Sequence, residues 1–210
     1  MEIRKSFYGE EMRVIVGCEF SQIVTMAFRK KGHEAYSCDL LPTEGNPQWH
    51  FQEDILKVLE SEKFDLGIFH PPCTYLANSG VQHLHKDKSR WQLMYSARDF
   101  FLQLLNAPIK KVCVENPVPH KYARLPEYNQ IIQPYQYGHT VSKKTCLWLK
   151  GLPPLKPTKI VDKGERYIGK DGKPNGSKWY QLSPSKDRWK YRSRTFQGIA
   201  EALAEQWNFY

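Results

Sequence analysis

The stretch that decides the fold is Phe64-Asp-Leu-Gly-Ile-Phe-His-Pro-Pro-Cys-Thr-Tyr-Leu-Ala-Asn-Ser-Gly80. Residues 66–69 form a short apolar run with the length of a buried strand. The two prolines at 71–72 cannot donate to a sheet, so we expect the strand to end at about His70. Cys73 then lies just past a strand end, where an open α/β sheet binds its ligands. A cysteine held by a stiff diproline is a candidate nucleophile, and a small buried thiol is the alternative.

The N-terminal part of the chain has the pattern of a nucleotide-binding unit. Its predicted elements are a strand over 13–17, a turn over 18–21, a helix capped by Ser21 and closed by Gly32, and a strand over 34–38. Asp39 stands at the end of the second strand, about 20 residues past the first turn, where the acid of a Rossmann-like fold holds ribose hydroxyls. The usual glycine-rich turn is absent, which favours a cofactor without a pyrophosphate.

The rest of the chain continues the alternation of strands and helices. We expect a loop over 40–49, a short helix capped by Asp54, a long amphipathic helix over 91–105, a strand over 111–114, late strands over 131–137 and 144–149, and a final helix over 199–207. Glu115 and Asn116 follow the strand over 111–114, at the same sheet edge as Cys73; for Glu115 the alternative is a turn acid satisfied by local backbone. The predicted fold class is α/β, a mostly parallel sheet with helices on both faces and one cleft at these strand ends.

The composition is that of a compact domain that keeps its cysteines reduced. The chain has 210 residues, 40% of them hydrophobic, and no apolar run reaches the about 18 residues that span a bilayer. Five widely spaced cysteines, odd in number and without a Cys-x-x-Cys pair, argue against a disulfide framework and a structural zinc site. The first residues have no signal-peptide pattern. We expect no metal, no membrane partner and a cytoplasmic protein, in a bacterium or a phage-infected host.

The positive charge gathers in one segment. The formal net charge is +9, and between 156 and 194 twelve Lys or Arg face four Asp or Glu, so this segment alone carries +8. Trp179 and Trp189 are among the aromatic residues interleaved with it. This combination suits a polyanion with exposed bases, so we expect a nucleic acid partner, DNA first and single-stranded DNA among the candidates. A solvated basic loop is the alternative.

These features divide the chain into three parts. We expect a Rossmann-like catalytic domain over 1–155, a small basic lobe over 156–193, and a C-terminal helix over 194–210 that returns to the catalytic domain.

The order of these features resembles a cytosine-C5 DNA methyltransferase, in a short form similar to those carried in phage genomes, over most of residues 12–207. Pro71-Pro72-Cys73 resembles the Pro-Cys nucleophile motif of that family, and Glu115-Asn116-Pro117 is similar to its Glu-Asn-Val. The other matches are Cys18-Glu19-Phe20-Ser21 at the cofactor turn, Asp39 with Leu40 at the ribose, Asp54-Ile55 at the adenine, Pro71 beside the cofactor, and Arg194 to Ala200 at the final motif.

The resemblance implies the Rossmann-like fold of S-adenosylmethionine-dependent methyltransferases and methyl transfer from S-adenosylmethionine to cytosine in DNA. Cys73 would add to C6 of the base, Glu115 would bind its N3 and N4 edge, and Asn116 would position the Cys73 loop. The target base would leave its stack to be reached. The expected nucleic-acid contacts are Lys143, Lys144, Lys186, Arg188, Lys190 and Arg192.

Departures from the family keep other functions open. Its Gln-x-Arg-x-Arg segment is not found, and Lys143 and Lys144 are the candidates for the role of that arginine. The recognition region over 156–193 is short, which suits a single-stranded or loosely specified substrate. The alternatives are an enzyme that transfers another group to cytosine and an inactive nucleic-acid-binding module. A zinc cytidine deaminase is rejected, because Leu76 stands where its second cysteine belongs.

Overall fold

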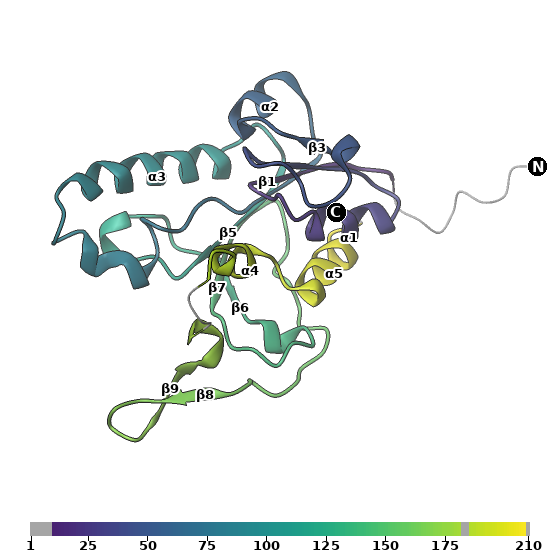
Figure 1. Ribbon diagram of the computed structural model, residues 1–210. Helices are drawn as coiled ribbons and strands as arrows, with labels where there is room; N and C mark the ends of the chain where they lie inside the picture. Colours follow the sequence, from purple (N-terminus) through teal and green to yellow (C-terminus); the bar gives the residue numbers. More distant parts are fainter. Residues whose placement is uncertain (1–9, 182–184, 209–210) are drawn as a thin grey trace, which may run out of the picture.

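A seven-stranded sheet with strand order β3-β2-β1-β4-β5-β7-β6 forms the core of the protein (Figure 1). The structure is a computed structural model that describes residues 10–181 and 185–208. The strands of the sheet are β1 (Arg13–Gly17), β2 (Glu34–Cys38), β3 (His50–Phe51), β4 (Leu66–Phe69), β5 (Lys111–Pro117), β6 (Gln130–Ile132) and β7 (Thr145–Lys150). The strands from β3 to β5 run parallel, and β7 runs antiparallel to β5 and β6. The predicted α/β, Rossmann-like class is confirmed.

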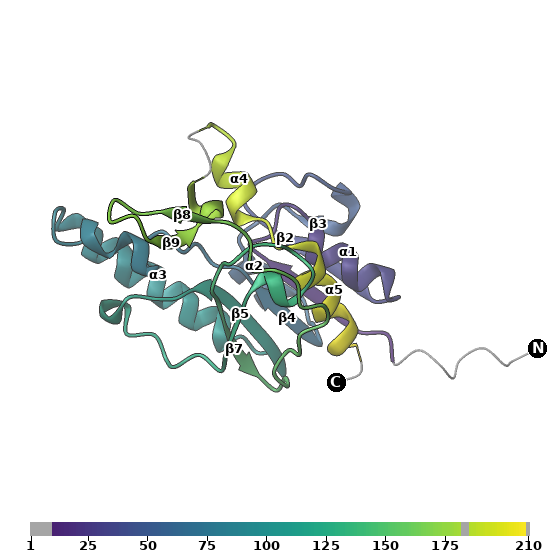
Figure 2. The same cartoon turned by 90° about the horizontal axis from the view of Figure 1, so that it is seen from below.

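Helices cover both faces of this sheet, as Figures 1 and 2 show. On one face α1 (Ile23–Lys30) packs beside α5 (Gln197–Gln206), and on the other lie α2 (Ile55–Ser61) and α3 (Ser89–Leu105). Successive side chains of a strand point to opposite faces. Val14 and Val16 are therefore buried with α1 and α5, whereas Ile15 is buried with α2 and α3.

Some predicted elements end at other residues than expected. The strand predicted over 131–137 is shorter than expected and ends with β6 at Ile132. Pro134 then begins a 3₁₀ turn, η4 (Pro134–Gln136). β5 continues through Glu115 and Asn116 to Pro117, since the antiparallel β7 pairs with it that far. The predicted loop over 40–49 ends in a 3₁₀ turn, η1 (Pro47–Trp49), which leads directly into β3.

The basic segment has secondary structure that the sequence did not predict. It contains a two-stranded hairpin, β8 (Arg166–Ile168) with β9 (Pro174–Ser177), then η5 (Lys178–Gln181) and α4 (Arg188–Ser193). Figure 1 shows the hairpin projecting from the body, while α4 returns toward the sheet. Because α4 returns toward the sheet, it brings Arg188, Lys190 and Arg192, three of the predicted nucleic-acid contacts, back to the body of the protein.

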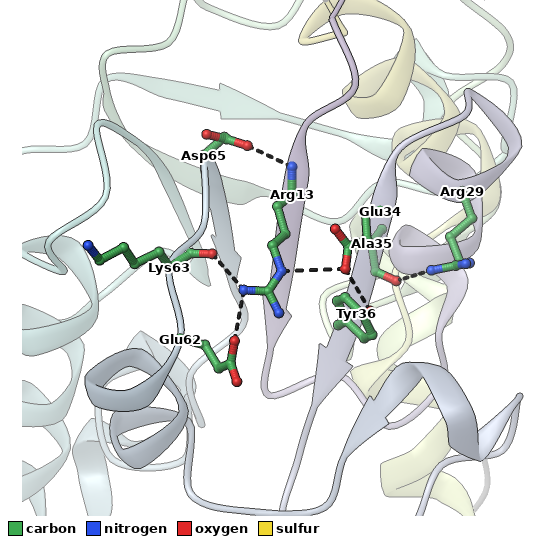
Figure 3. Close-up of polar contacts among 8 residues, drawn as sticks. All are labelled: Arg13, Arg29, Glu34, Ala35, Tyr36, Glu62, Lys63 and Asp65. Atoms are coloured by element: carbon green, nitrogen blue, oxygen red, sulfur yellow. Dashed lines mark hydrogen bonds and ion pairs between the residues drawn. The ribbon is translucent and has the colours of Figure 1, made fainter.

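The amino edge of the sheet is closed by polar contacts of Arg13, at the start of β1 (Figure 3). Its guanidinium contacts Glu62 at 2.8 Å and the Lys63 carbonyl at 3.0 Å, and it lies 3.5 Å from Glu34. The Arg13 amide donates to Asp65, which immediately precedes β4, at 2.7 Å. The acids at the amino edge are thus already paired with Arg13. The carboxyl edge is therefore the edge at which we expect a site.

The cap of α1 differs from the prediction. Ser21 does not cap this helix; the N-cap residue is Gln22, which has left-handed backbone and makes no side-chain cap bond. Instead the buried carboxylate of Glu19 accepts from the Val24 amide at 2.7 Å, and from the Thr25 amide and hydroxyl at 3.2 and 2.7 Å. A carboxylate satisfies these free amides and their partial positive charge better than a serine hydroxyl does.

A pair of alanine variants separates these two caps. Glu19→Ala should lower the free energy of unfolding by about 1–3 kcal/mol, because it leaves buried donors without an acceptor. Ser21→Ala is the matched control and should stay within about 0.5 kcal/mol of the wild type. Urea unfolding followed by circular dichroism measures both, and an equal loss in the two variants would contradict the Glu19 cap.

Candidate active site at the carboxyl edge of β4 and β5

The site is centred on the turn that follows β4. The His70 amide donates to the Gly17 carbonyl at 3.0 Å, which extends the pairing of β4 with β1 by one residue. The buried Asn116 side chain donates to the Pro71 carbonyl at 2.8 Å. The Cys73 carbonyl then accepts from the amides of Leu76 and Ala77, at 3.1 and 2.9 Å, and so closes a tight turn. Cys73 is half-buried and is held by contacts on both sides.

His70 and Glu115 face each other across the same two strands. β4 pairs with β5 in a register that sets Phe69 opposite Val114, so the next residues of the two strands are neighbours. His70 Nδ1 lies 2.8 Å from Glu115 Oε2, and their side chains are only 11% and 21% exposed. Burial by itself lowers the pKa of His70, but the hydrogen bond and charge of Glu115 outweigh it and raise that pKa. Burial likewise raises the pKa of Glu115, and the hydrogen bond and charge of His70 bring it below its usual value. The pairing therefore favours the ionised form of Glu115 and the protonated form of His70.

Two cations of distant segments act on Cys73. Burial raises the pKa of the Cys73 thiol, the charge of Lys143 lowers it, Glu115 raises it and Arg192 lowers it. Lys143 precedes β7, and its ammonium lies 5.0 Å from the centre of the Trp179 ring and 3.4 Å from the Arg192 carbonyl. The Arg192 guanidinium lies 5.5 Å from the same ring. Lys143 before β7 and Arg192 of the basic segment thus both act as positive charges on the predicted nucleophile.

The predicted cofactor turn follows β1, which lies between β2 and β4 in the sheet. The strand order reverses direction at this point, so the turn lies at the switch point of the sheet. Cys18 has left-handed backbone, Glu19 caps α1, and Ser21 is half-buried. Phe20 is buried, with its ring centre 5.7 Å from that of Trp189 in α4. The turn is therefore covered by the basic segment.

The acids that the resemblance assigned to the cofactor have different surroundings. Asp39 is half-buried, and its Oδ1 accepts from the Leu41 amide at 2.9 Å, while Leu40 is 73% exposed. Asp54 caps α2 by accepting from the Leu56 amide at 3.0 Å, as its alternative reading expected. Ile55 and Pro71 are buried. Leu40 is thus the exposed member of the set.

The predicted nucleic-acid contacts are not all gathered at Cys73. Lys143 and Arg192 are, whereas Lys144 and Lys186 are exposed away from these contacts. Arg188 donates to the Tyr180 carbonyl at 3.0 Å, and the Lys190 ammonium lies 5.8 Å from the Trp189 ring centre.

Comparisons with known proteins give structural likeness only. No protein family matches the sequence, and no curated protein matches it. Similar solved structures include a DNA modification methyltransferase encoded within a prophage of E. coli, with a TM-score of 0.44 and 16% identity over 71% of this chain and 51% of that one. Others are the Entamoeba histolytica methyltransferase EhMeth (TM-score 0.43, 17% identity, 72% of this chain and 58% of that one) and an Escherichia coli rRNA methylase (0.37, 14%, 67% and 58%). The chain spans only about half to three fifths of the length of these proteins.

Over residues 10–181 and 185–208 no three His, Cys, Asp or Glu side chains are placed to hold a metal ion. No helix there is long and apolar enough to cross a membrane.

Sequence reasoning missed His70 as a functional residue. It stands directly after β4 and before the diproline, at the same edge as Glu115, and that position was a usable signal. It also missed Trp179, whose ring lies near both Lys143 and Arg192, and the ion pair of Arg194 with Glu44 at 2.5 Å. These contacts join segments far apart in the sequence, so no local pattern contains them.

The charge of Lys143 should be measurable in the reactivity of Cys73. Lys143→Met removes a cation that lowers the pKa of the thiol, so the alkylation rate of Cys73 near pH 8 should fall about threefold or more. Lys144→Met, one residue along and exposed, is the matched control and should leave the rate unchanged. Iodoacetamide labelling with peptide mass spectrometry gives the rate at Cys73 alone. Equal rates in Lys143→Met and the wild type would show that this cation does not act on the thiol.

Proposed function

We propose that this chain is a methyltransferase that uses S-adenosylmethionine to methylate C5 of cytosine in a nucleic acid, with DNA as the expected substrate. The observation that carries the proposal is the joint placement of Cys73, Glu115 and Asn116 at the carboxyl edge of β4 and β5. The resemblance predicted these side chains as one group from motifs that lie about forty residues apart. They lie beside the switch point of the sheet, where open α/β proteins bind their ligands.

Cys73 would act by covalent catalysis. Its thiolate forms a bond to C6 of the base, and the electron pair of the C5–C6 double bond moves toward N3, which makes C5 nucleophilic. Once C5 carries the methyl group, its proton would pass to water acting as the base, the C5–H electron pair would restore the C5–C6 double bond, and the sulfur would leave C6 with its electron pair as the thiolate. Burial raises the pKa of the Cys73 thiol, and the charges of Lys143 and Arg192 oppose this rise and so favour the reactive thiolate.

Glu115 would bind the target base, and Asn116 would position the Cys73 loop. Glu115 is ionised and partly accessible, so its free oxygen can accept from the amino edge of cytosine and stabilise a protonated N3. Asn116 is bonded to the Pro71 carbonyl and would hold the turn in which Cys73 lies.

The residues near the switch point fit S-adenosylmethionine better than a dinucleotide. The amides at the start of α1, which would bind a pyrophosphate, already bond to Glu19. Asp39 retains a carboxylate oxygen, Oδ2, that is bonded to no described residue and could accept from ribose hydroxyls, and the exposed Leu40 could pack on a base. When bound there, the cofactor would supply an electrophilic methyl group.

The substrate class rests on the basic segment. Lys143 and Arg192 both lie near the Trp179 ring and both lower the pKa of Cys73, and α4 adds exposed Trp189 and Tyr191. Cations bind phosphates without regard to sequence, and aromatic rings stack on unpaired bases. An unstacked cytosine in single-stranded or flipped DNA would suit this surface.

A suicide base tests the proposed function directly. DNA with 5-fluorocytosine should form a covalent adduct with the wild type in the presence of S-adenosylmethionine, because fluorine cannot leave as a cation. Cys73→Ala should abolish the adduct and turnover. Cys146→Ala is the matched control, a buried cysteine of β7 whose pKa burial raises to about 11, and it should keep the adduct.

The outcomes separate the rival functions. An adduct that survives Cys73→Ala would contradict the assignment of the nucleophile. Binding of DNA without any adduct would favour the inactive binding module. Nucleoside analysis of unmodified DNA after reaction distinguishes a methyl group from another transferred group.

Asp39 should control cofactor affinity. Asp39→Ala removes a charge-assisted hydrogen bond worth about 1.5–3 kcal/mol, so the dissociation constant for S-adenosylmethionine should rise about tenfold or more. Asp99→Ala on α3, an exposed acid paired with Arg98, is the matched control. Isothermal titration calorimetry measures both, and an unchanged affinity in Asp39→Ala would refute the ribose assignment.

A further inference from the structure

The pairing of His70 with Glu115 leaves the carboxylate asymmetric. Glu115 Oε2 is bonded to His70 Nδ1 at 2.8 Å, while Oε1 has no hydrogen bond to any described residue. Ile68, His70, Cys113 and Glu115 line one small cavity, together with Lys143 and Arg194. His70 Nε2 is buried there without a partner among the described residues. One oxygen is thus fixed by the protein and the other is free for a ligand.

The charges that face this pair come from several elements. Glu115 of β5 and Glu19 of the β1–α1 turn favour the protonated imidazole of His70, whereas Lys143 before β7 disfavours it. Lys143 and His70 both favour the ionised form of Glu115, against the effect of its burial. The charge of Glu115 also raises the pKa of Cys73, which lies on the same turn as His70. Without His70, burial would push Glu115 toward its neutral form, leaving Lys143 as the cation that opposes this.

The protonation state of Glu115 decides which base edge it can bind. A carboxylate only accepts hydrogen bonds, whereas a neutral carboxyl also donates. Cytosine presents an amino donor at C4, and uracil or thymine presents an acceptor oxygen in the same place. A carboxylate therefore bonds the amino group and repels the 4-oxo group, and a buried polar mismatch of this kind discriminates strongly.

We propose that His70 is a specificity-determining positioning residue, which holds Glu115 as an oriented carboxylate with one free oxygen, so that the site accepts a 4-amino pyrimidine and rejects a 4-oxo pyrimidine. The inference rests on the proposed function, because it assigns the choice of base at that same site. His70 acts through Glu115 and does not itself contact the reacting atoms.

The test compares two suicide bases in one sequence. Single-stranded oligonucleotides carry either 5-fluoro-2′-deoxycytidine or 5-fluoro-2′-deoxyuridine at the target position, and adduct rates are measured with S-adenosylmethionine present. The wild type should prefer the cytosine analogue. His70→Leu should reduce this preference about tenfold or more, because a neutral Glu115 can donate to a 4-oxo group. His70→Asn keeps a donor near Nδ1 without the charge and should give a smaller reduction.

The pH dependence separates an electrostatic role from a structural one. In His70→Leu the pKa of Glu115 should lie higher, because the hydrogen bond and charge of His70 no longer oppose its burial, so the preference should recover as pH rises and Glu115 loses its proton. The N3 proton of 5-fluorouracil also dissociates as pH rises, in every variant alike, so the ratio of adduct rates in His70→Leu is divided by the wild-type ratio at each pH, and this quotient should approach one as pH rises. Titration of Cys73 changes both adduct rates together and cancels in their ratio. His120→Asn, which alters another buried histidine bonded to the Tyr75 carbonyl at 2.9 Å, is the matched control and should keep the wild-type ratio.

A second measurement does not depend on activity. Nitrogen-15 NMR of the imidazoles should give a raised pKa for His70 in the wild type and a lower one in Glu115→Gln. Equal values would overturn the inference, even where His70→Leu fails to fold. An adduct with an unchanged preference in a folded His70→Leu would overturn it too, while leaving the proposed function intact. No adduct with either base in the wild type would overturn the proposed function, and this inference with it.

Discussion

The parallel pairing of β4 with β5 is the constraint on which the site depends. Its register sets Phe69 opposite Val114, so the residues that follow, His70 and Glu115, meet at 2.8 Å. One residue further on, Asn116 reaches back to the Pro71 carbonyl and fixes the turn of Cys73. Because side chains alternate along a strand, a register shift by one residue would turn Glu115 to the other face and remove both contacts.

The basic segment contacts the carboxyl edge of the sheet at two places. Its Arg192 and the preceding Lys143 both lie near the Trp179 ring and both lower the pKa of Cys73, while Trp189 of α4 packs on Phe20 at the predicted cofactor turn. A nucleic acid held by this segment would therefore lie over both the nucleophile and the proposed cofactor position. Neutralising these cations with phosphate would also change the pKa of Cys73, which would link substrate binding to the readiness of the thiol.

Charged groups of the site also limit what it can bind. Glu19 fills the amide site at the start of α1 and so removes the usual phosphate cradle, and the ionised Glu115 offers acceptors only. Each carboxylate is held by partners from the protein itself, which keeps its geometry fixed before any ligand arrives. Under the proposed function, the choice of cofactor and base would rest on the protonation state and the free oxygens of Asp39 and Glu115.

The sequence by itself determined the strand and helix order, because apolar periodicity, prolines and glycines act locally. It placed β1 and β2 at their observed bounds and put Cys73 and Glu115 at one sheet edge. Only the tertiary structure decided the antiparallel insertion of β7, the cap by Glu19 in place of Ser21, the choice of Lys143 over Lys144, and the pairing of His70 with Glu115. These features depend on strand register and on contacts between distant segments, and the distances and charges involved exist only once the chain is packed.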